Sequence, residues 1–307
     1  MKRFREHRFL RSNGKPAFSS RIYQIESELE DVMNRNVITI TKTRSIKDCM
    51  DIMVENGLRR IPVADAENRL NGIVTATDVV NYFGGGEYYK IIVNKHKENI
   101  YSAFNESISS IMTKGVIKAY YYDKITNILE KMIKFNIGGL PVVLEDERIV
   151  GIITEADVLK QITGNVPEIK VKEAMNENVI TATPNLSLID IMKIIVNEGV
   201  RRLPLVVKNK PIGMVSAMDI VRYLSSSEPF RRAIGGSIRP CLEVKITDVS
   251  SPQVISVNEN MYLEDALDIM FKKDVGGLIV TDDKGQLKGI ITERDILISA
   301  IIEKEVS

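Results

Sequence analysis

Apolar and polar positions alternate along the chain in a way that predicts short helices and strands. The run SIKDCMDIMVENG (45–57) carries its apolar residues at the spacing of a helix, and Gly57 stands where that helix would end. Two apolar runs follow, RIPVAD (60–65) and LNGIVTA (70–76), with a polar turn between them. This stretch therefore predicts a helix followed by a β-hairpin.

Two further elements flank each helix and hairpin. A short β-rich run, NVITI (36–40) in the first case, precedes the helix, and a second helical segment, DVVNYF (78–83), follows the hairpin. The predicted order is β-α-β-β-α, which places the fold in the α/β class. One such unit is too small to bury both faces of its sheet, so we expect the units to pack in pairs, sheet against sheet.

Four copies of this pattern are present, and each has a Thr or Ser three residues before an aspartate. The four aspartates are Asp78, Asp157, Asp219 and Asp295. The spacing between alternate copies is nearly constant and the spacing between successive copies varies, so the unit duplicated last is a pair. The odd copies carry two arginines before a proline-containing strand, RRIP (59–62) and RRLP (201–204), and the even copies carry two glycines there.

The composition is that of a globular protein of about two domains, with 307 residues, 44% of them apolar, and a net charge of +1. Cys49 and Cys241 form no C-x-x-C motif, which argues against a disulfide framework or a zinc site and fits a reducing cytosol. His7 and His96 are isolated, so we expect no metal and no catalytic centre. No apolar run approaches the roughly 18 residues of a membrane span, and we expect a cytoplasmic protein that does not contact membranes.

A basic tail, residues 1–30, begins the chain, with seven Lys or Arg and one Glu among its first 21 residues. Such a charge run is typical of a solvated arm, and the alternative is contact with nucleic acid or with an acidic partner. The tyrosines at 120–122 follow a predicted strand, and we expect them to pack at a module interface rather than to stack on bases.

The odd copies carry the groups that an adenosine phosphate requires. Such a ligand needs an apolar slot for its base, acceptors for its ribose hydroxyls, and cations for its phosphates. In chain order, the arginines would mark the phosphate end, Ile61 and Pro62 the wall against the base, and Asp78 the ribose end. The alternative is that Thr75 and Asp78 only cap the helix and that the arginines are a solvated pair.

These repeats resemble the CBS-domain family, and their pairing resembles the two-repeat arrangement called a Bateman module. The linker YFGGGEYYKIIVNKHKENIYSAFNESISSIMTKGV (82–116) is similar to the joint of archaeal four-CBS proteins related to the gamma subunit of AMP-activated protein kinase. The resemblance implies four CBS repeats in two tandem modules packed as a disc. The implied modules are 31–163, with repeats 31–83 and 108–163 and linker 84–107, and 168–307, with repeats 168–224 and 245–303 and linker 225–244.

In this family the aspartate holds the ribose, the hydroxyls before it assist, and backbone at a strand edge receives the adenine. The candidate residues of the odd repeats are Thr39, Arg59, Arg60, Ile61, Pro62, Thr75, Thr77 and Asp78 in the first and Thr181, Arg201, Arg202, Leu203, Pro204, Ser216 and Asp219 in the third. The even repeats offer fewer, Lys118, Thr154 and Asp157 in the second and Thr292, Arg294 and Asp295 in the fourth. Glycines replace the arginines there, so we expect the odd sites to fill first.

The resemblance implies a non-catalytic sensor that binds AMP, ADP or ATP, the last with Mg²⁺, and passes its occupancy to a regulated kinase or other enzyme. A sensor of S-adenosylmethionine is the first alternative, but such a ligand would leave the arginines idle. A regulator that uses the basic tail on nucleic acid is the second. IMP dehydrogenase, which also carries a CBS pair, is excluded because the repeats leave no room for its catalytic barrel. We expect no catalytic cofactor, and a monomer or homodimer.

Overall fold

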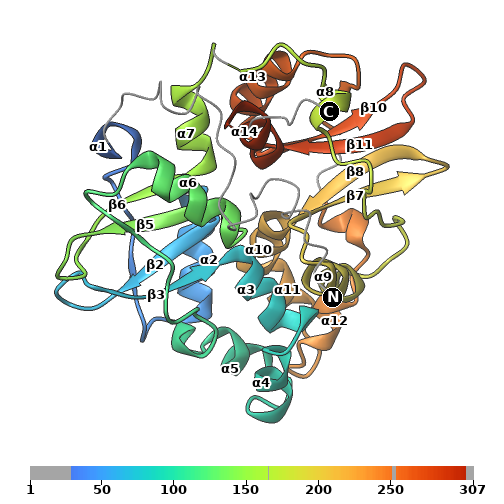
Figure 1. Cartoon of the computed structure of the whole chain (residues 1–307). Helices are drawn as coiled ribbons and strands as arrows, with labels where there is room; N and C mark the ends of the chain where they lie inside the picture. Colours follow the sequence, from blue (N-terminus) through green and yellow to red (C-terminus); the bar gives the residue numbers. More distant parts are fainter. Residues whose placement is uncertain (1–28, 165, 251–253, 302–307) are drawn as a thin grey trace. The chain divides into compact units, whose positions relative to one another are not determined.

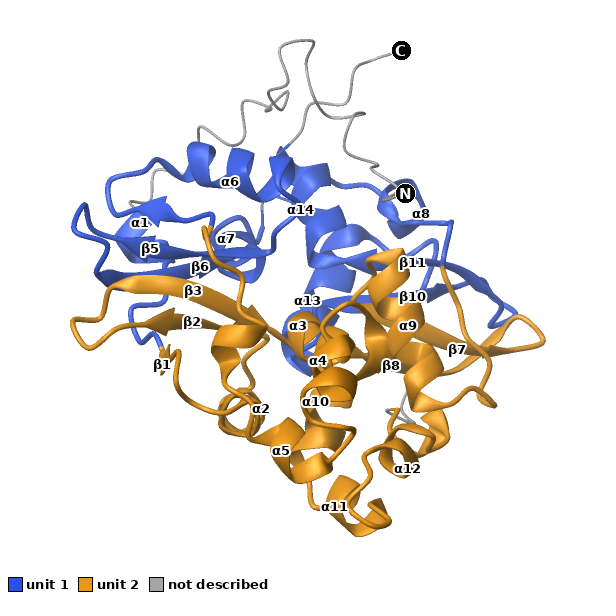
Figure 2. Cartoon of the chain, turned by 90° about the horizontal axis from the view of Figure 1, so that it is seen from below, with its two compact units in different colours: residues 1–37, 117–179, 255–307 blue, residues 38–116, 180–254 orange. Residues whose placement is uncertain are grey.

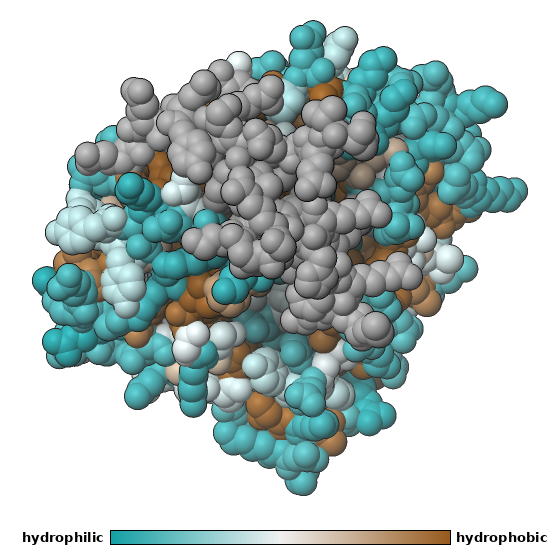
Figure 3. Space-filling model, in the orientation of Figure 1, coloured by the Kyte–Doolittle hydropathy of each residue, from teal (hydrophilic) through white to brown (hydrophobic). Residues whose placement is uncertain are grey.

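The computed structural model describes residues 29–164, 166–250 and 254–301 (Figure 1). The basic tail therefore lies outside the described residues, apart from Leu29 and Glu30 at the start of helix α1 (Leu29–Val32). No helix among the described residues is long and apolar enough to cross a membrane. On the face that Figure 3 shows, the described surface is mostly hydrophilic and its hydrophobic areas are small and separate.

The first repeat has the predicted order of elements. It consists of β1 (Ile40–Thr41), α2 (Ile46–Glu55), β2 (Arg60–Ala64), β3 (Leu70–Thr75) and α3 (Ala76–Val80). Helix α2 begins with a capping box, in which Ser45 and Asp48 exchange hydrogen bonds, and its buried face carries Ile46, Met50 and Met53. Gly57 follows the helix with φ +64°, which confirms its role in ending it.

The other repeats follow the same order, with one difference. The second contains β4 (Ala119–Tyr120), α6 (Ile125–Lys134), β5 (Gly139–Val143), β6 (Ile149–Thr154) and α7 (Glu155–Gln161); the third, α9 (Leu188–Glu198), β7 (Arg202–Val207), β8 (Lys210–Ser216) and α10 (Ala217–Ser225); the fourth, β9 (Ser256–Asn258), α13 (Leu263–Lys273), β10 (Gly277–Thr281), β11 (Leu287–Thr292) and α14 (Glu293–Ile301). In the third repeat a single parallel bridge between Ala182 and Leu205 replaces the first strand. In the three-stranded sheets of the other repeats, the middle strand is the first strand of the hairpin. It pairs parallel with the strand that begins the repeat and antiparallel with the second strand of the hairpin.

Alternate repeats share a compact unit. Unit 1 holds the described parts of 1–37, 117–179 and 255–307, which contain the second and fourth repeats, and unit 2 holds 38–116 and 180–254, which contain the first and third (Figure 2). Each unit has its own cluster of buried apolar side chains. The modules predicted above group successive repeats instead, and their boundaries and sheet-against-sheet packing stay a prediction.

Helices join the two repeats of unit 2. Helix α2 packs against α10, where Ser225 donates a hydrogen bond to Asp51, and the π-helical turn η3 (Asn81–Gly85) packs against α9. The remaining elements of this unit are α4 (Tyr89–Asn94), α5 (Ile100–Phe104), η4 (Ile108–Ser110), α11 (Glu228–Arg232), α12 (Arg239–Leu242) and η5 (Ile246–Asp248). Because η3 directly continues α3, which carries the candidate Asp78 in its first turn, this helical segment reaches the third repeat.

The segment that leads into a repeat lies on the hairpin of another repeat. In unit 1, Asn176 follows helix α8 (Val171–Ala174) and forms an antiparallel bridge with Ile290 of the fourth repeat. A Cβ on the neighbouring Gly289 would lie 2.6 Å from Sδ of Met175 and 2.9 Å from the carbonyl oxygen of Asn176. The same arrangement recurs for Met33 over Gly151 in unit 1 and for Met112 over Gly72 in unit 2. Glycine is therefore required where a leading methionine covers the strand.

We predict that Gly85→Ala lowers the free energy of unfolding by about 1–3 kcal/mol, because its Cβ would overpack the contact between η3 and α9. That Cβ would overlap the side chain of Val196 and lie 2.9 Å from the carbonyl oxygens of Met192 and Val80. Chemical denaturation measures the loss. Gly85 does not have a positive φ, so the loss should come from the overpacked contact rather than from backbone strain. A Gly85→Ala protein as stable as the wild type would show that η3 does not need this close approach.

Candidate functional site

Each of the four aspartates caps the helix that follows its hairpin. In the first repeat, Oδ2 of Asp78 accepts hydrogen bonds from the backbone N–H and the hydroxyl of Thr75, both at 2.7 Å, and the N–H of Asp78 donates to Oγ1 of Thr75 at 3.3 Å. The same three bonds link Thr154 to Asp157, Ser216 to Asp219 and Thr292 to Asp295. These residues therefore form capping boxes at the starts of their helices, and the prediction that they also bind a ligand stays a prediction.

Capping uses one carboxylate oxygen and leaves the other available for a ligand. Among the described residues, none donates a hydrogen bond to Oδ1 of Asp78 or of Asp157. In the third repeat, Oδ1 of Asp219 accepts a hydrogen bond from Arg222, which lies one turn further along α10. A carboxylate oxygen at the end of a strand is a good acceptor for a ribose hydroxyl, so capping and ligand binding are compatible at Asp78.

The environment of Asp78 disfavours its charge. Burial raises the pKa of Asp78 above its ordinary value, and the hydrogen bonds from Thr75 offset only part of that effect. The same carboxylate also helps burial to raise the pKa of the Cys49 thiol, to about 12. A donor that reached Oδ1 would stabilise the ionised carboxylate, so this oxygen gains from binding a hydroxyl.

The arginine pairs lie beside the capping threonine or serine. Arg60 is the Cα partner of Thr75 in the β2–β3 register, and the carbonyl oxygen of Arg59 accepts a hydrogen bond from Ala76. In the third repeat Arg202 is likewise the partner of Ser216, next to Arg201. The antiparallel hairpin brings its two outer ends together, so the arginines at its start lie beside the threonine or serine at its end. The groups predicted to bind phosphate and those predicted to bind ribose therefore share one end of the strands.

Two residues of the expected apolar wall face the core instead. The side chains of Ile61 and Leu203 are wholly buried in the apolar cluster of unit 2. Successive residues of a strand point to opposite faces, so Pro62 and Pro204 have their side chains on the other face of the sheet. Only backbone groups of Ile61 and Leu203 can meet a ligand.

The remaining hydroxyls of the odd repeats lie close to these strands. Thr39 is half-buried and precedes β1, which pairs with β2. Thr181 is exposed and precedes Ala182, whose N–H donates to the carbonyl oxygen of Pro204 at 2.9 Å. Thr77 is half-buried in the first turn of α3.

The even repeats keep the capping pair but use their cations elsewhere. Gly139 and Gly277 are the register partners of Thr154 and Thr292, so glycine occupies the place of the second arginine. The ammonium of Lys118 forms an ion pair with Glu147. Arg294 donates through Nε to the buried Glu155 at 2.5 Å, and its buried Nη2 has no hydrogen-bond partner among the described residues. The first contact links the strands of the second repeat, and the second links the second repeat to the fourth within unit 1.

His96 is not isolated, contrary to the expectation from sequence. Its Nε2 lies 2.5 Å from Oε2 of the buried Glu106, which also accepts hydrogen bonds from Lys95 at 2.7 and 3.0 Å. Burial alone would raise the pKa of Glu106, but these two partners outweigh it and the pKa is lowered. The cluster ties the linker together, and within the described ranges no group of three or more metal-ligating side chains is found.

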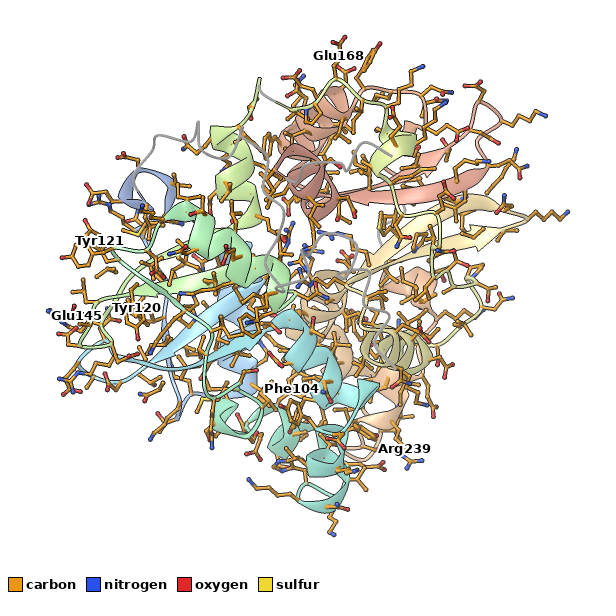
Figure 4. The ribbon with its side chains drawn as sticks, viewed as in Figure 1. Phe104, Tyr120, Tyr121, Glu145, Glu168 and Arg239 are labelled. Atoms are coloured by element: carbon orange, nitrogen blue, oxygen red, sulfur yellow. The ribbon has the colours of Figure 1, made fainter. Side chains whose placement is uncertain are left out.

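Two of the tyrosines at 120–122 are exposed, and the rings of Tyr121 and Tyr122 pack edge to face with their centroids 5.1 Å apart. Tyr122 is 80% exposed and Tyr120 is 40% exposed, and the hydroxyl of Tyr121 donates to Glu30. Figure 4 places Tyr120 and Tyr121 at the edge of the second repeat, on the same side as Glu145. Packing of these side chains at a module interface stays a prediction.

Comparison with known families agrees with this arrangement of repeats. Four CBS domains are matched, at residues 29–85, 108–164, 171–226 and 246–300. These matches cover most of the chain, which therefore belongs to the CBS-domain proteins.

Two archaeal proteins are similar over most of this chain. Protein MJ1225 of Methanocaldococcus jannaschii is 33% identical over 86% of this chain and 95% of its own length. Its crystal structure, described as that of a proposed archaeal homologue of γ-AMPK, matches with a TM-score of 0.85 over 88% of this chain and 99% of that one. A 33.4 kDa protein encoded in a ribosomal RNA operon of Thermofilum pendens is 30% identical over 84% of this chain and 86% of its own.

A more distant structure shares the fold alone. A protein of Pyrococcus horikoshii matches with a TM-score of 0.57 and 17% identity, over 89% of this chain and 100% of that chain. The predicted family and the predicted fold class are thus confirmed.

We predict a pH-dependent contribution of Asp78 to stability. Its pKa is raised in the folded chain, so the folded state binds this proton more readily than the unfolded state. The resulting stabilisation is complete below the ordinary aspartate pKa of about 4 and is lost as the pH rises through the raised value. The free energy of unfolding of the wild type, relative to Asp78→Asn, should therefore fall across this window and then level off.

Chemical denaturation at a series of pH values measures this difference. Thr77→Ala, in the same turn of α3, is the control, since it removes no titrating group and its difference from the wild type should not change with pH. A difference for Asp78→Asn that grew with rising pH would mean that the pKa of Asp78 is lowered, and it would contradict the account of this carboxylate.

Proposed function

We propose that this protein is a non-catalytic sensor that binds adenine nucleotides, AMP, ADP or ATP, at its CBS repeats, the first repeat foremost. One observation carries the proposal: Oδ1 of Asp78 accepts no hydrogen bond from a described residue, beside the strand end that carries Arg59 and Arg60. A nucleotide has its ribose hydroxyls and phosphates within a few ångströms of one another, as these groups require. The third repeat repeats the set with Arg201, Arg202 and Asp219.

Several features favour a nucleotide over an uncharged or cationic adenosyl ligand. Guanidinium groups match phosphate oxygens in a fork geometry. Both odd repeats place one arginine opposite the capping residue, Arg60 opposite Thr75 and Arg202 opposite Ser216, with a second arginine directly before it. S-adenosylmethionine has no phosphate for these guanidinium groups to bind. In the even repeats Lys118 and Arg294 are held by carboxylates, so a phosphate would have to compete for them, with Mg²⁺ as a counter-ion if the ligand is ATP.

The helix that follows Asp78 provides a route from site to output. Asp78 caps α3, α3 continues into η3, and η3 packs on α9 of the third repeat. A ligand on Asp78 would act on an equilibrium between two arrangements of the η3–α9 contact. It would shift that equilibrium by no more free energy than the difference between its binding free energies for the two arrangements. The output would be a regulated kinase or other enzyme in the cytoplasm, with the sensor as a monomer or homodimer. The similarity to MJ1225, described as a proposed homologue of γ-AMPK, supports the kinase.

Calorimetric titration of nucleotide-stripped protein tests the proposal. We predict that AMP, ADP or ATP binds and that Asp78→Ala weakens one site about tenfold or more, because a hydrogen bond to a charged acceptor is lost. Asp268→Asn, an exposed carboxylate on α13, is the matched control and should leave binding unchanged. No binding of any adenine nucleotide to the wild type would overturn the proposal. Preferential binding of S-adenosylmethionine would overturn the role of the arginines.

A further inference from the structure

The two odd repeats differ in the state of the aspartate oxygen that a ribose would use. Oδ2 of Asp219 is held by the N–H and the hydroxyl of Ser216, at 2.8 and 2.6 Å. Oδ1 accepts a further hydrogen bond from Nη1 of Arg222 at 2.8 Å, in an ion pair one turn along the helix. Both oxygens of Asp219 are therefore engaged before any ligand arrives, whereas Oδ1 of Asp78 accepts no hydrogen bond from a residue that the structure describes.

The residues at the equivalent position explain why the repeats differ. Asn81 stands three residues after Asp78, and its side-chain oxygen accepts a hydrogen bond from the N–H of Tyr88 at 3.0 Å. Lys160 stands three residues after Asp157 and, within the described ranges, donates no hydrogen bond to it. Only an arginine in this position reaches back to the carboxylate with a planar group that matches it.

The ion pair sits where it can open. The side chain of Arg222 is 60% exposed and that of Asp219 is 18% exposed, so water can solvate the guanidinium group once it leaves the carboxylate. Ion pairs as exposed as this one are weak. A ligand that must break this pair to reach Asp219 should therefore bind about two- to fivefold less tightly than a ligand that need not. The core does not rest on Arg222, so its removal should leave the fold intact.

We propose that Arg222 is an affinity-determining residue of the third repeat, which competes with the ribose hydroxyls of a nucleotide for Asp219. The inference rests on the proposed function and deepens it by ranking the two odd sites. A ligand with a ribose diol fills the first repeat before the third, although both carry the same arginine pair and the same capping box. The third site then responds at higher nucleotide concentration and extends the range of the sensor.

Titration with AMP in an Asp78→Asn background tests this ranking. Asparagine leaves the helix cap in place and removes the charge that serves the first site, and the third site is identified as the one that Asp219→Ala abolishes. Arg222→Ala should tighten AMP binding at that site by about two- to fivefold. Arg222→Lys, which keeps the charge but loses the planar donor, should fall between the wild type and Arg222→Ala.

Arg231→Ala is the matched control. Arg231 forms the same kind of exposed pair three residues apart, Nη1 to Oε1 of Glu228 at 2.9 Å, with no capping aspartate involved, and its loss should not change AMP affinity. A second readout uses 2′-deoxy-AMP, which lacks one ribose hydroxyl. Its loss of affinity relative to AMP should be smaller at the third site than at the first, and Arg222→Ala should enlarge that loss at the third site.

The outcomes separate the two proposals. If the chain binds no adenine nucleotide, the proposed function fails and this inference falls with it. If AMP binds at both odd sites and Arg222→Ala leaves the third unchanged or weaker, the function stands and the inference is overturned, because Arg222 then holds Asp219 in place or contacts the nucleotide.

Discussion

The reciprocal hydrogen bonding between a threonine or serine and an aspartate three residues later is the interaction on which each repeat depends. It fixes the turn from the last strand into the second helix, and it occurs at all four copies. Its geometry consumes one carboxylate oxygen and directs the other outward from the cap. In the first repeat this leaves a partly desolvated acceptor with a raised pKa beside two arginines, so one structural device produces both a stable helix start and a place for a ribose.

The four copies share a backbone and differ in the charges around it. Where the hairpin begins with arginines, positive charge lies opposite the cap, and where it begins with glycines that charge is absent. Cations that remain in the even repeats, Lys118 and Arg294, are already paired with carboxylates. On the proposed function, single side chains at fixed register positions would set the affinity of each site without any change of fold.

The order of elements and the family could be predicted because both follow from local pattern: helical spacing in α2, Gly57 after it, and the Thr/Ser-x-x-Asp motif. Features that depend on distant contacts could not. The side chain of Ile61 is buried in the core, and His96 contacts Glu106, ten residues further along the chain. Met175 packs over Gly289 of another repeat. Arg222 was missed although its spacing from Asp219 is that of one helical turn, because pattern alone does not tell which acceptor a long cation chooses.

The measurement that tests the central claim most directly is a crystal structure of the chain with AMP bound. The account predicts a ribose hydroxyl about 2.5–3.0 Å from Oδ1 of Asp78, with both hydrogen bonds from Thr75 to Oδ2 still in place. The phosphate should lie toward Arg59 and Arg60, at the same end of the hairpin. AMP bound with its ribose away from Asp78, or bound only after the cap had opened, would contradict the claim that one carboxylate serves helix and ligand together.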